Sequence, residues 1–226
     1  MTETHKTLAL WGEFEKSLLK GNGIDIGCGS DPVSPSARRF DVADGDANRI
    51  TDYVKDVFDY VYSSHCLEHM VDAPSALFQW WQLVKAGGYL ILIVPDEDLY
   101  EQGEFPSRFN HDHKWTFTIS KSDSWSPKSI NLLDLAKSLP NSEIVTICLQ
   151  DNGYDRRLLK HGYYTTFQSI LSFALRCYRR IRGKSFNKMY SPIEALRRQC
   201  LKVDQTDPTI FPRALAQIQV ILRKVG

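Results

Sequence analysis

Two glycines flanked by carboxylates lie near the amino terminus. Asp25 precedes Gly27-Cys28-Gly29, and Asp31 follows this pair of glycines. A short apolar run that ends in a carboxylate and two glycines is typical of a strand entering a tight loop, where a ligand can lie against bare backbone. The third glycine of the G-x-G-x-x-G pattern, which places a pyrophosphate on a helix amino terminus, is missing. Since carboxylates disfavour phosphate and favour a cation, we expect a ligand with an ammonium, a sulfonium and an adenosine rather than NAD.

Two stretches rich in histidine could bind a metal. Residues 65–69 match the H-x-x-E-H pattern of zinc peptidases. That chemistry requires both histidines on one helical face, whereas His65 directly follows a predicted strand. His111 and His113 alone are too few ligands for a site. We therefore expect no metal, and both a structural role and a place in the substrate pocket stay open for these histidines.

Apolar periodicity predicts alternating strands and helices. The run 89–94 is continuously apolar, as in a parallel strand that is buried on both faces. Short steps from strand to helix to strand are typical of a doubly wound α/β fold. The predicted strands are 24–26, 39–42, 58–62, 89–94, 143–149 and 216–223, and the predicted helices are 7–19, 67–84 and 130–139, with further helices in 155–210.

The composition is that of an ordinary globular protein. Of 226 residues, 42% are hydrophobic and 24% are charged. No apolar run approaches the roughly 20 residues of a membrane span, and the amino terminus lacks a signal-peptide pattern, which predicts a cytoplasmic location. The five cysteines never form a C-x-x-C pair. We expect reduced thiols and no structural zinc.

The net charge of +1 hides an asymmetry. Residues 1–150 carry a formal charge of −9 and residues 151–226 carry +10. A basic final third favours an anionic partner, such as a phosphorylated substrate, nucleic acid or a lipid surface, and equally a role in neutralising the acidic part. The arginines at 176–182 could bind phosphates of a nucleotide-linked or lipid-linked sugar, but a solvated helix end is the preferred interpretation.

Three motifs in order resemble class I S-adenosylmethionine-dependent methyltransferases. Residues 23–29 resemble their first motif, and residues 58–69 resemble their fourth-strand motif. Residues 83–90 resemble the turn into their fifth strand, with Ala86 where proline is usual. The resemblance covers about residues 20–95 and is greatest to the type-11 methyltransferases found with bacterial polysaccharide genes.

The resemblance implies which residues bind S-adenosylmethionine. They lie in four groups, at the carboxyl ends of the first, second and fourth strands of the family. The groups are Asp25, Gly27, Cys28 and Gly29 for the amino-acid end, Asp41 (with Asp44 as an alternative) for the ribose, Asp46 and Ala47 for the adenine, and Ser63, Ser64 and His65 near the methyl group.

A hydroxyl nucleophile also needs a base, which must come from loops at the carboxyl ends of the strands. Asp96 follows the strand 89–94. If the alternating run that ends at Ile119 extends back, His113 and His111 share its inner face. We expect His113 to be the base, with His111 second and Asp96 as a further candidate.

The resemblance implies a Rossmann-like α/β fold with a mostly parallel seven-stranded sheet and helices on both faces. We expect one domain, 1–226, with an N-terminal helix (1–20), a cofactor-binding core (21–154), a helical insertion that forms a cap or dimer surface (155–210), and a final strand (211–226).

The expected function is O-methylation of a small carbohydrate or surface-glycan precursor, whose sugar could be phosphorylated or nucleotide-linked. Methylation of RNA, methylation of a small-molecule nitrogen and binding of the cofactor without turnover remain alternatives. No RNA-binding module is visible, which disfavours a nucleic-acid partner.

Overall fold

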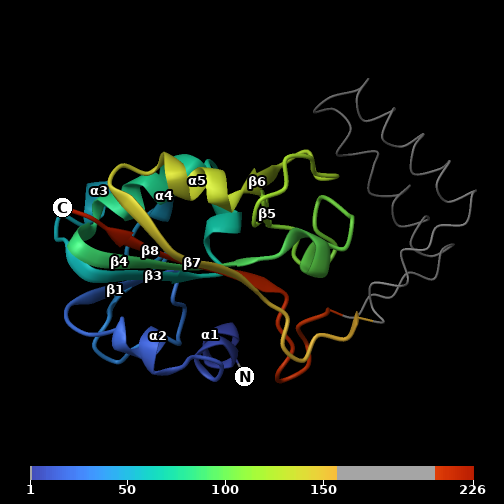
Figure 1. Ribbon diagram of the computed structural model, residues 1–226, viewed down its shortest axis with the longest axis horizontal. Coiled ribbons are helices and arrows are strands. Elements are labelled where there is room, and N and C mark those ends of the chain that lie inside the picture. The colour runs from blue at the N-terminus through green and yellow to red at the C-terminus, as the bar shows by residue number, and fades with distance from the viewer. Residues whose placement is uncertain (1, 157–206) are drawn as a thin grey trace, which may run out of the picture. The chain divides into compact units, whose positions relative to one another are not determined.

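The computed structural model describes residues 2–156 and 207–226 (Figure 1). The chain divides into two compact units, Met1–Tyr154 with Asp207–Gly226, and Asp155–Thr206. Most of the predicted helical insertion (155–210), with its arginines at 176–182, lies outside the described residues.

The first unit contains a mixed sheet, which confirms the predicted α/β class. Its strand order is β2-β1-β3-β4-β8-β7. The first four strands in that order run parallel, and β8 is antiparallel to both of its neighbours. The strands are β1 (Gly23–Ile26), β2 (Arg38–Phe40), β3 (Phe58–Ser64), β4 (Val84–Pro95), β7 (Ser142–Gln150) and β8 (Gln217–Lys224).

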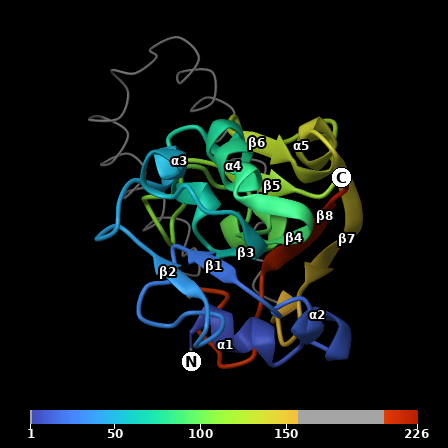
Figure 2. The same cartoon turned by 90° about the vertical axis from the view of Figure 1, so that its left-hand side faces the viewer.

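Helices cover both faces of the sheet (Figures 1 and 2). On one face lie α1 (Glu3–Leu8) and α2 (Glu13–Ser17), and on the other lie α3 (Ile50–Tyr53), α4 (Ala73–Gln82) and α5 (Leu132–Ser138). The larger core contains the fully buried Trp80 and Trp81 of α4, and the smaller core contains Tyr60 and Tyr62 of β3. In the described ranges, no helix has the length and apolar character that crossing a membrane would require.

Two predicted helices are shorter than expected. The helix predicted over 7–19 is divided into α1 and α2, because Gly12 starts a new helix and its N–H donates to the Glu15 carboxylate at 3.0 Å. The helix predicted over 67–84 begins only at Ala73. The Asp72 side chain caps it, and Pro74 lies in its first turn, where its missing N–H costs nothing. Before it, η2 (Leu67–His69) is a single 3₁₀ turn.

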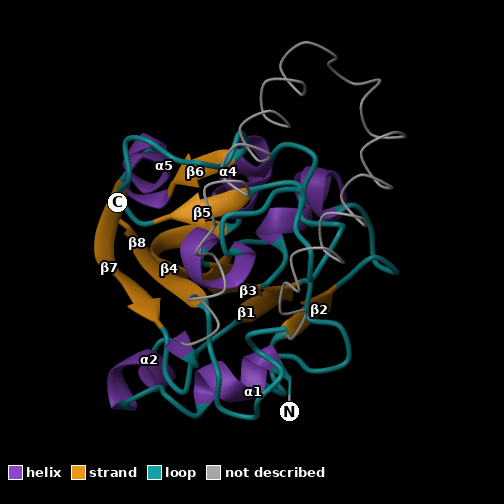
Figure 3. Ribbon diagram, turned by 90° about the vertical axis from the view of Figure 1, so that its right-hand side faces the viewer, coloured by secondary structure: helices purple, strands orange, loops and turns teal. Residues whose placement is uncertain are grey.

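The described part of the main sheet has six strands where seven were expected. Residues 41–57, which link β2 to β3, form η1 (Ala47–Arg49) and α3 instead of another strand. A separate parallel pair, β5 (Thr116–Thr118) and β6 (Ser129–Asn131), lies beside α5 (Figure 3). An isolated bridge between Asp96 and Phe117 joins this pair to the end of β4.

Gly23 provides a test of the packing between β1 and β3. A methyl group on Gly23 would lie 1.9 Å from Cζ of Tyr60, the residue paired with it across the strands. We expect Gly23→Ala to lower the free energy of unfolding by about 1–3 kcal/mol, because the buried ring has no room to move. Chemical denaturation measures this change. Gly12→Ala, whose added methyl would meet only Glu15 Oε2 at 3.4 Å, is the control, and an equal loss in both variants would contradict the packing argument.

Candidate functional site

The two glycines after β1 form a loop of exposed backbone. Gly27 and Gly29 have φ angles of 78° and 54°, which side chains disfavour. The Gly27 N–H donates to the Phe40 carbonyl at 2.8 Å, and the Gly29 N–H donates to the Asp41 carboxylate. A Cβ on Gly29 would meet none of the described atoms within 4 Å. The loop is therefore held against β2 while Gly29 faces open space, as a ligand-binding backbone requires.

Asp25 stabilises the loop from inside. Its side chain is buried, and its carboxylate accepts a hydrogen bond from the Val33 N–H at 2.6 Å. Burial raises the pKa of Asp25 to about 7, although the Val33 hydrogen bond opposes this shift. In this geometry Asp25 connects the two ends of the loop, and its contact with a cofactor stays a prediction.

The acidic residues after β2 support one another. Asp44 accepts a hydrogen bond from the Asp41 N–H at 2.9 Å, so it orients Asp41 and leaves the Asp41 carboxylate beside the glycine loop. Asp46 caps η1 by accepting from the Asn48 N–H at 2.9 Å. The Ala47 carbonyl accepts from the Trp80 indole at 2.9 Å. The predicted ribose and adenine residues therefore lie on one segment that Trp80 holds in place.

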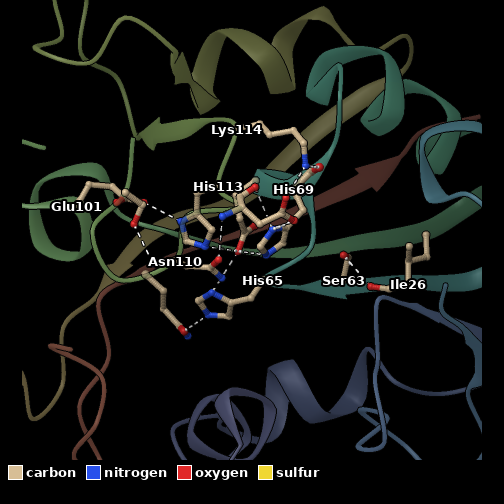
Figure 4. Close-up of polar contacts among 12 residues, drawn as sticks. Ile26, Ser63, His65, His69, Glu101, Asn110, His113 and Lys114 are labelled. Carbon is tan, nitrogen blue, oxygen red and sulfur yellow. Dashed lines mark hydrogen bonds and ion pairs between the residues drawn. The ribbon is translucent and has the colours of Figure 1, made fainter. Parts of the chain in front are cut away.

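The end of β3 lies beside the end of β1, where the glycine loop begins. The Ser63 hydroxyl donates to the Ile26 carbonyl at 2.9 Å, so this buried group joins β3 to β1 (Figure 4). Cys66 Sγ would lie 2.6 Å from a Cβ placed on Gly27. The half-buried Ser64 and His65 lie between these two contacts along the chain. The predicted methyl-group residues are thus next to the predicted cofactor loop, but the Ser63 hydroxyl is used by the backbone.

Three histidines, His65, His69 and His113, lie close together (Figure 4) and contact one buried glutamate. We call His65, Glu68, His69 and His113 the histidine cluster. Oε1 of Glu68 lies 3.5 Å from His65 Nδ1, 4.0 Å from His69 Nε2 and 3.9 Å from His113 Nε2. Glu68 is fully buried, and neither of its oxygens has a hydrogen-bond partner among the described residues. All three imidazoles therefore turn one nitrogen toward the same carboxylate.

The outer nitrogen of each imidazole in the histidine cluster has its own partner. His113 Nδ1 lies 2.7 Å from Glu101 Oε1, and His69 Nδ1 lies 3.0 Å from Asp112 Oδ2. His65 Nε2 lies 3.0 Å from Gln217 Oε1. These contacts determine the orientation of each ring, and the three partners come from separate parts of the chain.

Backbone contacts bring the cluster together. The N–H groups of Lys114 and Trp115 both donate to the Glu68 carbonyl, at 2.7 and 3.3 Å. Glu101 lies on η3 (Glu97–Glu101), one π-helical turn that Asp96 caps by accepting from the Leu99 N–H at 2.9 Å. Such turns are frequent at functional sites. Burial raises the pKa of Asp96 to about 6.

Charge inside the cluster is strongly coupled. Burial by itself would raise the pKa of Glu68, but His65 and the other two imidazoles outweigh it and hold that pKa below its usual value. Burial would likewise lower the pKa of His65, but the charge of Glu68 outweighs it and raises that pKa. Glu68 is therefore ionised at neutral pH although it has no contact with water.

The structure separates the two histidines that were expected to share a face. His113 is 5% exposed and belongs to the cluster, whereas His111 is exposed. The expectation that both point inward is wrong because the strand begins only at Thr116. Before it, the His113 N–H closes a turn onto the Asn110 carbonyl at 3.2 Å.

Two residues of the histidine cluster and two of its partners were absent from the sequence-based candidates. The cluster residues are Glu68 and His69, and the partners are Glu101 and Gln217. The H-x-x-E-H pattern did mark Glu68 and His69, but their link to His113 and Glu101 appears only in the fold.

The chain is similar to known methyltransferases in sequence and in fold. The family model described as a methyltransferase domain matches residues 4–161, well over half of the chain. A solved structure from Bacillus halodurans C-125, described as a methyltransferase, is 15% identical over 100% of both chains, with a TM-score of 0.50. This likeness supports the shared fold. No curated protein matches the chain.

Two further solved structures are similar to the chain at lower TM-scores. The YcgJ protein from Bacillus subtilis is 10% identical, with 98% of this chain and 100% of that chain covered and a TM-score of 0.49. The plantazolicin methyltransferase BamL, solved with a desmethyl plantazolicin analogue and SAH, is 11% identical, with 99% and 86% covered and a TM-score of 0.46.

Gly29 tests the cofactor loop. We expect Gly29→Ala to abolish measurable binding of S-adenosylhomocysteine, because its methyl group would occupy the open space that faces the bare backbone. The backbone strain of φ 54° costs about 1–2 kcal/mol, so the variant still folds. Gly87→Ala, at φ 80° and also with open space around its added Cβ, is the matched control for strain. Calorimetric titration measures both, and equal affinity in the two variants would count against this loop.

Asp25 gives a pH-dependent test. Its unfolded pKa is near 3.8 and its folded pKa is about 7, so the folded state binds a proton more tightly and loses stability as pH rises between these values. As the pH rises from 4 to 7, we expect the free energy of unfolding of Asp25→Asn to increase by on the order of 1–4 kcal/mol relative to that of the natural protein. Above pH 7 this difference should stay constant. Denaturant titrations across this range measure the difference. A difference that stays constant from pH 4 to pH 8 would contradict the burial argument.

Proposed function

Because the chain belongs to the family of methyltransferase domains and S-adenosylmethionine is its methyl donor, we propose that it methylates a hydroxyl oxygen of a small polar molecule. A carbohydrate or surface-glycan precursor is the proposed acceptor class. The observation that carries this proposal is the histidine cluster beside the glycine loop. A hydroxyl group must lose a proton during methyl transfer, and this cluster is built from groups that accept protons.

The methyl transfer itself is an in-line displacement. An oxygen lone pair of the acceptor forms a bond to the methyl carbon, and the bond between that carbon and sulfur breaks. Its electron pair stays on sulfur, which becomes the neutral thioether of S-adenosylhomocysteine. The hydroxyl proton passes to the histidine cluster, where His113 is the proposed base. Most of the remaining catalysis is alignment of the two reactants and exclusion of water.

The position of the cluster supports this role. Cys66 contacts Gly27 in the cofactor loop, and Glu68 follows two residues later on η2. The His113 ring is oriented by the Glu101 carboxylate at 2.7 Å, which stabilises the imidazolium that forms when a proton arrives. The side chains of His65 and His69 are 20% and 25% exposed, so an acceptor can approach the cluster from their side.

The acceptor class rests on different evidence. The resemblance to methyltransferases found with bacterial polysaccharide genes favours a sugar, which could be phosphorylated or nucleotide-linked. A neutral amine needs no base, so a cluster of proton acceptors favours oxygen over nitrogen. The RNA alternative depends on the basic final third of the chain, most of which lies outside the described residues.

The cellular location is part of the same proposal. Cys28, Cys66 and Cys148 are free thiols, as expected for a reducing compartment. This supports the cytoplasm, where activated sugars are available. The helical insertion over 155–210 stays a prediction as a cap or as a dimer surface.

His113 tests the proposed reaction. We expect His113→Ala to lower turnover about 10²- to 10⁴-fold, since general-base catalysis contributes on that order, while the affinity for S-adenosylhomocysteine stays within about twofold. The exposed His111→Ala is the matched control and should keep full turnover. Transfer of labelled methyl groups to a panel of hexoses, nucleotide-sugars and amines measures the rates. Unchanged turnover in His113→Ala, or transfer to amines alone, would overturn the proposal.

A further inference from the structure

We propose that Glu68, His69 and His113 bind one divalent transition-metal ion of the Zn²⁺, Fe²⁺ or Co²⁺ kind. This inference goes against the metal-free site expected from the sequence. It deepens the proposed function and rests on it for the role of the ion. A cation at this point would polarise the acceptor hydroxyl and lower its pKa. His113 would then hold the ion, and the hydroxyl proton would pass to solvent on the side of the partly exposed His65 and His69.

The spacing of the donor atoms suits a metal. One donor atom from each of Glu68, His69 and His113 lies within 4.8 Å of the other two. Bonds of about 2.0–2.2 Å at the tetrahedral angle place neighbouring ligand atoms about 3.4 Å apart. The distances from Glu68 Oε1 to His69 Nε2 and His113 Nε2 are 4.0 and 3.9 Å. These distances are too long for hydrogen bonds, and small rotations of the side chains bring them to metal-ligand spacing.

The hydrogen bonds around the cluster leave a lone pair on each inner nitrogen. The outer Nδ1 atoms of His113 and His69 face the Glu101 and Asp112 carboxylates, which only accept, so each Nδ1 carries the proton. Where the rings are neutral, each Nε2 is an acceptor that faces the acceptor oxygens of Glu68. Three acceptors then converge without a donor, and a metal ion between them would satisfy all three. Metal-binding histidines are typically oriented by carboxylates in this way.

A chain of amides also determines the tautomer of His65. The Trp11 indole can only donate, and it donates to Gln219 Oε1 at 2.7 Å. Gln150 Nε2 donates to the same oxygen at 3.0 Å, and Gln217 Nε2 donates to Gln150 Oε1 at 2.6 Å. Gln217 Oε1 is therefore the acceptor for His65 Nε2.

With Nε2 paired to Gln217 Oε1, His65 directs Nδ1 at Glu68 Oε1, 3.5 Å away. We assign His65 as a positioning residue for the Glu68 carboxylate. Its partial exposure, with that of His69, gives an ion a path into the cluster.

The donor set selects the class of metal. Two imidazole nitrogens and one carboxylate are the ligands of catalytic Zn²⁺ sites and of iron sites with two histidines. Mg²⁺ and Ca²⁺ prefer oxygen ligands throughout. Three protein ligands also leave coordination positions open for an acceptor. We therefore expect transition metals to bind and Mg²⁺ not to bind.

Cobalt provides a direct test. The full chain is freed of metal with a chelator and dialysed. It is then titrated with Co²⁺ while visible absorption is recorded. Competition with Zn²⁺ gives the affinity of the protein for Zn²⁺. We expect one Co²⁺ per chain, visible absorption bands that Zn²⁺ removes, and no effect of Mg²⁺. A protein whose cluster holds only shared protons would show no such bands, and that result would overturn the inference.

Variants assign the ion to the cluster. We expect Glu68→Gln and His113→Ala to weaken Co²⁺ binding at least 100-fold, and Glu101→Gln, which changes only the partner of His113, to weaken it about 10- to 100-fold. His111→Ala is the matched control and keeps the affinity of the natural protein. Circular dichroism and binding of S-adenosylhomocysteine show whether each variant is folded. Unchanged Co²⁺ affinity in the folded Glu68→Gln variant would overturn the inference.

The metal site and the proposed function can fail separately. If the natural protein binds no Co²⁺ but still transfers methyl groups to hydroxyls, the metal site is overturned and His113 remains the base. Bound Co²⁺ in a protein that methylates no hydroxyl would keep the site and overturn the proposed function. Metal-dependent methyl transfer that is abolished by chelation and restored by Zn²⁺ or Co²⁺ would support both.

Discussion

The buried charge of Glu68 is the constraint on which the rest of the site depends. An ionised carboxylate without water or hydrogen-bond donors costs several kcal/mol unless positive charge lies nearby. The fold provides three imidazoles for it, from the end of β3, from η2 and from the segment before β5. Each imidazole is in turn oriented by an outer acceptor. The hydrogen-bonded side chains from Trp11 to Gln217 orient His65, and the π-helical turn that carries Glu101 orients His113. Both features therefore serve to place an imidazole beside Glu68.

Parallel strands explain why this chemistry gathers at one edge of the sheet. The carboxyl ends of β1, β2, β3 and β4 meet there, and the groups that follow each strand become neighbours. Short contacts hold that edge together, such as the Ser63 hydroxyl on the Ile26 carbonyl and the Gly27 N–H on the Phe40 carbonyl. The glycine loop, predicted to bind the cofactor, and the histidine cluster can therefore be adjacent although different strands carry them.

Two buried carboxylates of this edge show opposite pKa shifts. Asp25 has one backbone N–H as its main partner, and burial raises its pKa to about 7. Glu68 lies among imidazoles, and they hold its pKa low despite complete burial. The cofactor carries a positively charged sulfonium, which favours the ionised form of a carboxylate near the loop. One carboxylate is thus available to respond to a bound cation, and the other is already ionised before any ligand arrives.

Local signals in the sequence determined the glycine loop, the order of strands and helices and the resemblance to methyltransferases, because backbone sterics and apolar periodicity act between residues close in the chain. The cofactor-binding roles of Asp41 and Gly29 rest on the same local signals and stay predictions. That His113 lies near Glu68 while His111 faces solvent depends on the fold, because the backbone N–H groups of residues 114 and 115 donate to the Glu68 carbonyl. The breaks in the predicted helices, at Gly12 and before Asp72, likewise depend on caps and packing that periodicity does not encode.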